Sequence, residues 1–215
     1  MAKVTPRFDH GPDPDVTPRV LDILSARGIR SSFFVLGRKL ADVKARPLTE
    51  RAKREGHWIA NHTYTHTTPL GRIEDASQAV GEIAGCEAEI GGLAETPKLF
   101  RPLGGAGKIG PHLLSRAARD HLMANDYTCV LWNSIPADWE AGGEWVERAL
   151  EQTAAQAWSL VVLHDIPGGC VDDLERFLDA LEARGDDIVQ DFPPACLPIV
   201  AGQLVRPDAL PEPAL

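Results

Sequence analysis

The chain has 215 residues, of which 44% are hydrophobic and 25% are charged, and it carries a formal net charge of −9. This size and composition predict one globular domain over residues 1–215, with a loose proline-rich tail from about residue 205. The negative charge argues against nucleic acid or an anionic membrane as the partner. No stretch has the apolar length of a membrane span, and the first residues lack the apolar region of a signal peptide, so we expect a cytoplasmic protein.

Short apolar runs alternate with helical patterns along the chain, which is typical of an α/β fold with mostly parallel strands. We expect Pro6 to weaken the first strand, Thr17 to cap the first helix and Pro47 to interrupt the second helix. The predicted strands cover residues 4–8, 31–36, 57–60, 99–100, 128–132 and 160–163, and a further strand and a short helix follow residue 186. The predicted helices cover residues 18–27, 40–54, 74–90, 111–124, 144–157 and 171–184.

Polar side chains follow the ends of these predicted strands. In parallel α/β folds the carboxyl ends of the strands share one rim, and this rim carries the active site. Charged and imidazole groups that converge there need a metal ion or mutual hydrogen bonds to offset their desolvation. The candidates are Asp9, His10, His62, His66, Arg101, Asp138 and His164.

His62 and His66 stand four residues apart in a polar stretch. On a helix or a single helical turn, side chains with this spacing share a face and can reach one metal ion. The alternative interpretation is a pair of solvent-facing histidines, because the pattern is short. The other strand-end residues favour the metal site.

Five motifs in order resemble the polysaccharide deacetylase family, which is also known as the NodB-homology domain or carbohydrate esterase family 4. The family's first motif, Thr-Phe-Asp-Asp-Gly-Pro, corresponds here to Arg7-Phe8-Asp9-His10-Gly11-Pro12. Its fourth, Asp-x-x-Asp-Trp, corresponds to Asp138-Trp139 with Ile135 at the first Asp. The second, third and fifth motifs stand as His62-Thr63-Tyr64-Thr65-His66, Arg101-Pro102-Leu103-Gly104-Gly105 and Val161-Val162-Leu163-His164.

The resemblance implies a distorted (β/α)7 barrel and metal-assisted hydrolysis of an acyl group. It also implies a role for each matching residue. Asp9 would be the general base, Arg101 would orient it, and Asp138 would hold Arg101. The other implied roles are two metal ligands (His62 and His66), a general acid (His164), a wall of the acyl-methyl pocket (Leu163) and a backbone oxyanion donor (near Gly104). A Trp such as Trp139 is more often a packing residue than a substrate-stacking one, and at the rim we expect it to do both.

His10 departs from the family pattern, in which an Asp at this position is the third metal ligand. Three neutral imidazoles with an open fourth position form a known zinc arrangement, and imidazole suits Zn²⁺ better than harder cations. We therefore expect a divalent metal, Zn²⁺, bound by His10, His62 and His66. The contrary interpretation is that His10 does not ligate and the site binds metal weakly or not at all.

Together with the three imidazoles, the resemblance implies a zinc-dependent hydrolase of non-peptide C–N bonds that deacetylates an N-acetylated sugar or a related small amide. Asp9 would take a proton from water activated by the ion, with a pKa that Arg101 and the ion keep low, and His164 would protonate the leaving nitrogen. One alternative is a cytoplasmic amidohydrolase of the allantoinase or cyclic-imide type, acting on a small molecule. Another is a non-catalytic member with a decayed site.

Overall fold

The computed structural model describes residues 1–140 and 144–210, and nearly all its strands run parallel in one curled sheet. The strand order is β6-β1-β2-β3-β4-β5-β8-β9, and β7 pairs with β1. All the pairs from β6 across to β5 are parallel, whereas β8 and β9 form an antiparallel hairpin beside β5. The strands are β1 (Lys3–Asp9), β2 (Ser32–Val35), β3 (Trp58–Asn61), β4 (Lys98–Phe100), β5 (Tyr127–Cys129), β6 (Trp158–His164), β7 (Asp187–Ile188), β8 (Ile199–Val200) and β9 (Gln203–Leu204).

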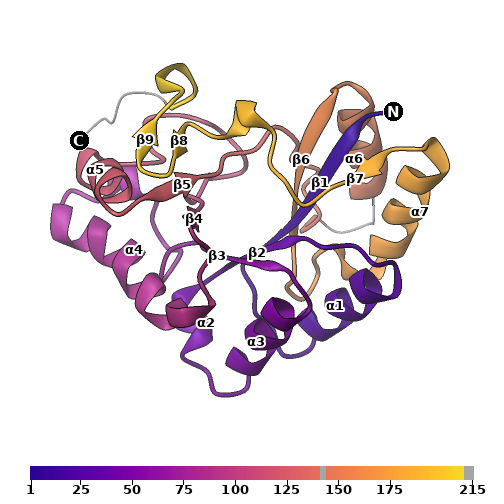
Figure 1. The fold of residues 1–215 in the computed structure, drawn as a ribbon, viewed down its shortest axis with the longest axis horizontal. Coiled ribbons are helices and arrows are strands. Elements are labelled where there is room, and N and C mark those ends of the chain that lie inside the picture. The colour runs from indigo at the N-terminus through magenta and orange to yellow at the C-terminus, as the bar shows by residue number, and fades with distance from the viewer. Residues whose placement is uncertain (141–143, 211–215) are drawn as a thin grey trace.

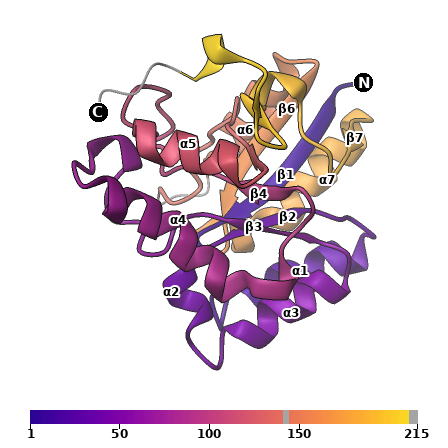
Figure 2. The same cartoon turned by 60° about the vertical axis from the view of Figure 1, so that its left-hand side comes forward.

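The helices lie around the outside of the curled sheet (Figure 1), and the turned view shows α4 and α5 covering one side of it (Figure 2). Within the described ranges, no helix is both long enough and apolar enough to cross a lipid bilayer. The helices are α1 (Thr17–Ala26), α2 (Gly37–Leu40), α3 (Arg46–Arg54), α4 (Ala76–Ile90), α5 (Arg116–Ala124), α6 (Trp145–Ala154) and α7 (Leu174–Arg184).

The sheet curls far enough to close on itself through one bridge. Just beyond β5, the Ser134 N–H donates to the carbonyl of Leu160 at 3.2 Å, and the Ser134 carbonyl accepts from the N–H of Val162 at 3.1 Å. The predicted distorted barrel is confirmed. It consists of six parallel strands, with the two-residue β7 as the seventh.

Side chains alternate between the two faces of β1 and β6, as strand geometry requires. Phe8 and Leu163 pack in a buried cluster with residues of α1 and α7, whereas Val162 belongs to a second cluster. Arg7 and Asp9 therefore share the face of β1 opposite to Phe8. Both side chains are buried at the interior of the barrel.

Three local predictions were wrong. Pro6 does not weaken β1, which is a central strand of seven residues, and the Pro6 carbonyl accepts a hydrogen bond from Ser31 Oγ at 2.7 Å. Thr17 is not the cap of α1: Asp13 accepts from the neighbouring backbone N–H groups, and the Thr17 hydroxyl donates to Asp165. Pro47 lies in the first turn of α3 and so begins that helix, where its missing N–H costs nothing.

The tail expected to be loose from about residue 205 falls partly outside the described residues. The N–H of Val205 donates to the carbonyl of Pro198 at 2.9 Å, and the side chain of Leu210 is buried in the second cluster. The chain therefore stays packed through residue 210, and residues 211–215 lie outside the described part.

Candidate active site

A pocket of about 490 Å³ opens where the carboxyl ends of the parallel strands meet, and all seven predicted strand-end residues lie in or beside it. Its floor is polar, and its walls come from the loop after β4, the loop after β5, and β6. The lining residues are Asp9, His10, His62, His66, Arg101, Leu103, Gly104, Gly105, Ala106, Gly107, Ile135, Trp139, Val162, His164 and Ile166.

The imidazoles of His10, His62 and His66 form a cluster on this floor. The ring centroid of His10 lies 5.4 Å from that of His62 and 4.3 Å from that of His66, and those of His62 and His66 are 4.5 Å apart. One nitrogen from each ring lies within 4.8 Å of the others. The structure thus brings the three predicted ligands together.

The predicted helical turn does not carry His62 and His66. They lie in a loop after β3 in which Thr63 and His66 have φ values of 70° and 55°. Glu82 of α4 holds this loop, because its carboxylate accepts hydrogen bonds from the N–H groups of Tyr64 and Thr65 and from the Thr65 hydroxyl. The side chains of His62 and His66 converge because the loop backbone is left-handed at Thr63 and His66. The prediction of a helical turn gave the right pair of residues for a different geometric reason.

The cluster fits a metal that prefers nitrogen donors. His62 Nδ1 donates to the backbone carbonyl of Arg101 at 2.9 Å, which leaves Nε2 as the free lone pair. Burial lowers the pKa of His10 to about 2, that of His66 to about 4, and that of His62 well below its ordinary value. Neutral imidazoles offer the lone pairs that a metal ion needs.

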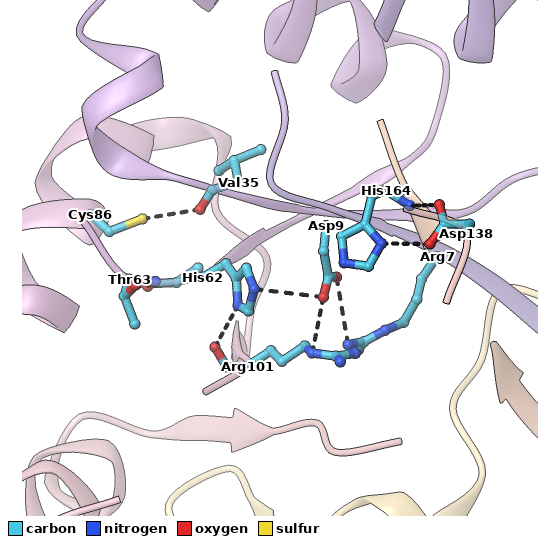
Figure 3. A network of polar contacts seen from close by, with 10 residues as sticks. Arg7, Asp9, Val35, His62, Thr63, Cys86, Arg101, Asp138 and His164 are labelled. Atoms are coloured by element: carbon cyan, nitrogen blue, oxygen red, sulfur yellow. Dashed lines mark hydrogen bonds and ion pairs between the residues drawn. The ribbon is translucent and has the colours of Figure 1, made fainter. Parts of the chain in front are cut away.

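Asp9 lies beside this cluster and is held by two guanidinium groups. Its Oδ2 is 3.0 Å from Arg101 Nε and 3.6 Å from His62 Nε2, and its Oδ1 is 3.6 Å from an Arg7 nitrogen (Figure 3). Burial raises the pKa of Asp9 to about 6, although the charge of Arg7 opposes this. Among the protein's own groups burial outweighs the neighbouring charges, so the low pKa expected for Asp9 depends on the charge of a bound ion and stays a prediction.

Asp138 does not hold Arg101, contrary to the role that the resemblance implied. Instead, Asp138 Oδ1 accepts from His164 Nδ1 at 2.7 Å and its Oδ2 accepts from the His164 backbone N–H at 2.7 Å. The bridge between Ser134 and Val161 places the Asp138 loop against the end of β6, which explains this partner. Arg101 instead stacks on the ring of Trp132 at 4.3 Å.

The pair with Asp138 sets the protonation of His164. Burial by itself lowers the pKa of His164, but the hydrogen bond and charge of Asp138 outweigh burial, so the pKa is raised. His164 Nδ1 is engaged by the carboxylate, so Nε2 is the nitrogen left for a ligand. An imidazole that holds its proton in this way suits a general acid.

The pocket wall contains Val162 and not Leu163. Leu163 is fully buried in the cluster on the outer face of β6, because residues 162 and 164 share the inner face of that strand. Trp139 lies edge-on to His164 at 5.0 Å and is 41% exposed, in keeping with a position at the rim. Gly104 lines the pocket as well.

The glycines of the loop after β4 let it pack closely on the barrel. A Cβ at Gly104 would lie 2.4 Å from the ring of Trp132, and one at Gly107 would lie 2.8 Å from Ile135. Trp132 Nε1 also donates to the Gly107 carbonyl at 2.6 Å. The loop is thereby fixed over the pocket as one of its walls.

Sequence reasoning missed Arg7, Glu82 and Asp165. Arg7 could have been found from its position two residues before Asp9 on the same strand face. Asp165 follows His164 and is fully buried, and burial raises its pKa to about 7 against the hydrogen bond from Thr17. For Glu82, which lies in the helical pattern, no local signal indicated its contact with the histidine loop.

The fold and the site together define an α/β-barrel enzyme with three clustered imidazoles beside a held carboxylate and a carboxylate–imidazole pair. The model of the polysaccharide deacetylase family matches residues 2–124, and the chain belongs to this family of hydrolases.

Individual proteins agree with this assignment. The chain is 30% identical over 191 residues to a peptidoglycan-N-acetylglucosamine deacetylase of Bacillus cereus, with 86% of this chain and 65% of that protein covered, so it spans slightly less than two thirds of that relative. It is 31% identical over 197 residues to a chitooligosaccharide deacetylase of Bradyrhizobium, with 84% and 85% covered. A family 4 acetyl xylan esterase from Clostridium thermocellum, solved in complex with a cobalt ion, superposes with a TM-score of 0.71 at 25% identity, covering 87% of each chain.

Proposed function

We propose that this protein is a metal-dependent deacetylase that hydrolyses the amide of an N-acetylated sugar. One observation carries the proposal: the imidazole cluster, the Asp9–Arg101 pair and the Asp138–His164 pair all face one pocket. The names of the relatives, which include deacetylases of peptidoglycan N-acetylglucosamine and of chitooligosaccharides, support this substrate class.

His10, His62 and His66 would hold the ion, and their nitrogen donors favour Zn²⁺. A bound divalent ion would supply Lewis-acid polarisation of the carbonyl and a lower pKa for the attacking water. The cobalt ion in the acetyl xylan esterase supports a divalent metal in this family.

Side chains of the protein would carry out the two proton transfers. Asp9, oriented by Arg101 at 3.0 Å, accepts the proton of the attacking water. His164, kept protonated by Asp138, donates a proton to the leaving nitrogen, which is a poor leaving group without it. A backbone N–H near Gly104 would stabilise the oxyanion, a type of donor typically worth about 3–4 kcal/mol.

The test is release of acetate from tetra-N-acetylchitotetraose by the purified protein loaded with Zn²⁺ or Co²⁺. We expect activity that a chelator abolishes and that returned metal restores. Asp9→Asn and His164→Ala should each bind the oligosaccharide but release acetate at least about 100-fold more slowly, as expected for loss of a general base or acid. A metal-loaded protein that releases no acetate from acetylated sugars would contradict the proposal.

A second candidate, an amidohydrolase of a small amide or cyclic imide, is favoured by the pocket walls. Away from the polar floor, the described wall residues are glycine or apolar, including Leu103, Ile135, Val162 and Ile166. Such walls suit an apolar substituent better than a sugar hydroxyl. Allantoin and a series of substituted cyclic imides, assayed beside chito-oligosaccharides, would separate the two candidates.

A further inference from the structure

Arg7 is a buried charge that the mechanism above does not use. Its side chain is fully buried, and none of its three nitrogens has a hydrogen-bond partner within residues 1–140 and 144–210. The guanidinium lies over the ring of Phe34 at 4.2 Å, and the carboxylate beside it is that of Asp9, at 3.6 Å. An arginine placed in this way costs folding free energy, so a functional reason is needed for its presence.

The carboxylate of Asp9 lies close to the imidazole cluster. Its Oδ2 lies 3.6 Å from His62 Nε2, the nitrogen that is free to bind a metal. A divalent ion bound by three neutral imidazoles would strongly attract this carboxylate as a further ligand. A carboxylate that joins the metal shell is no longer free to act as a base.

Two guanidinium groups oppose that movement. Arg101 Nε lies 3.0 Å from Asp9 Oδ2 and Arg7 lies 3.6 Å from Oδ1, so each oxygen forms an ion pair with its own guanidinium group. Figure 3 shows both guanidinium groups approaching the carboxylate from the same side, with His62 on another. The contacts therefore hold the carboxylate on the guanidinium side of the pocket floor.

Two departures from the family's first motif are consistent with this role of Arg7. Compared with the family's first motif, this chain has Arg7 in place of Thr and His10 in place of Asp. The first change adds a positive charge behind Asp9, and the second removes the carboxylate that would otherwise complete the metal shell. Because His10 replaces the Asp of the family motif, Asp9 is the nearby carboxylate that a bound metal would attract as a ligand. The positive charge of Arg7 opposes that movement.

We propose that Arg7 is a positioning residue that, together with Arg101, keeps the Asp9 carboxylate out of the shell of the three-histidine metal site, so that Asp9 serves as the base. This role rests on the proposed hydrolase function for its catalytic consequence. Its consequence for metal binding can be measured without any substrate.

The experiment compares Arg7→Met with Arg7→Lys, each in the wild-type chain and in an Asp9→Asn chain, using Co²⁺ as the probe. Co²⁺ affinity is measured by equilibrium titration, and the visible Co²⁺ spectrum reports coordination. We expect Arg7→Met to bind Co²⁺ about tenfold more tightly with an altered spectrum, because Asp9 then joins the shell. Arg7→Lys, which keeps the charge, should stay within about threefold of the wild type.

The Asp9→Asn chains separate positioning from simple charge. In that background, Arg7→Met should leave the spectrum unchanged and gain much less affinity. An unchanged spectrum in Arg7→Met, equal affinity gains in both backgrounds, or a wild-type protein that does not bind Co²⁺ would each overturn the proposal. If Arg7→Met does not fold, Arg7→Gln makes the same comparison, because it too removes the charge.

Kinetics and thermal stability complete the test. On a hydrolysed substrate, Arg7→Met should lower kcat about 100-fold with little change in KM, and Arg7→Lys should restore most of it. The melting temperature of Arg7→Met, measured beside that of the wild type, checks that a loss of kcat is not a loss of folding. If Arg7→Met changes Co²⁺ binding as expected but no acyl substrate is hydrolysed, the proposed function is wrong and the positioning role is supported. If a substrate is hydrolysed but Arg7→Met leaves Co²⁺ binding unchanged, only the positioning role is wrong.

Discussion

Asp138 accepts two hydrogen bonds from His164, one from the imidazole ring and one from the backbone N–H. The two carboxylate oxygens accept from Nδ1 and from the N–H of the same residue, each at 2.7 Å, and both side chains are buried. This contact fixes the ring orientation and keeps the imidazole protonated to higher pH than burial alone would allow. The site therefore contains two separate charge pairs, one for the base and one for the acid.

Replacing Asp138 with Asn should lower the pKa of His164, because the charge that raises it is lost. His164 must be protonated to act as the acid, so the alkaline limb of the pH profile of kcat/KM should move to lower pH. We expect kcat at neutral pH to fall about 10²–10³-fold. Asp172→Asn, at an exposed aspartate, is the matched control and should leave both limbs of the pH profile in place. An alkaline limb that does not move in Asp138→Asn would contradict the role of His164 as the general acid.

Loss of one cluster imidazole should release the metal. We expect about one Zn²⁺ per chain in the wild type and far less in His10→Ala, His62→Ala or His66→Ala, because three donors define the site. Elemental analysis after purification without added metal measures this. His121→Ala, on α5 and outside the cluster, should keep its metal, and retention of zinc in His10→Ala would mean that His10 is not a ligand.

Gly104→Ala should damage the pocket wall. The new Cβ would lie 2.4 Å from the ring of Trp132, so the loop must shift, at a cost of about 1–3 kcal/mol in unfolding free energy and a higher KM. Gly81→Ala in the exposed middle of α4 meets no atom within 4 Å and should stabilise the protein by about 0.5–1 kcal/mol. Chemical denaturation of both variants checks the contrast.

Asp165 should make stability depend on pH. Its pKa is about 7 in the folded protein and near 3.8 when unfolded, so the native state favours the neutral carboxyl, and this contribution is present at pH below 4 and lost as the pH rises through 7. Asp165→Asn cannot ionise, so relative to the wild type it should gain about 1–3 kcal/mol between pH 5 and pH 8. Urea denaturation at the two pH values measures the difference; equal differences at both would refute the ionisation of Asp165 in this range.

Much of the site followed from sequence pattern. The strand-end rule placed Asp9, His62 and His164 at one rim, because parallel strands end together whatever their order. The helix boundaries were less exact: the helix predicted at residues 111–124 starts at Arg116, where the Ser115 hydroxyl accepts from the Ala118 N–H. The predicted helix start lay too early because Leu113 and Leu114 continue the apolar pattern, although the Leu113 N–H donates to the Gly110 carbonyl in a turn that precedes the helix.

The sequence by itself determined the fold class, the rim and the residue types gathered there, since these depend on periodicity and on motif order along the chain. The tertiary structure alone decided the partners: Asp138 with His164, Arg101 with the ring of Trp132, and Glu82 with the histidine loop. The bridge from Ser134 to Val161 joins segments 27 residues apart and sets which loop meets which strand. Such pairings depend on strand order, register and the face of each strand, and spacing along the chain does not encode them.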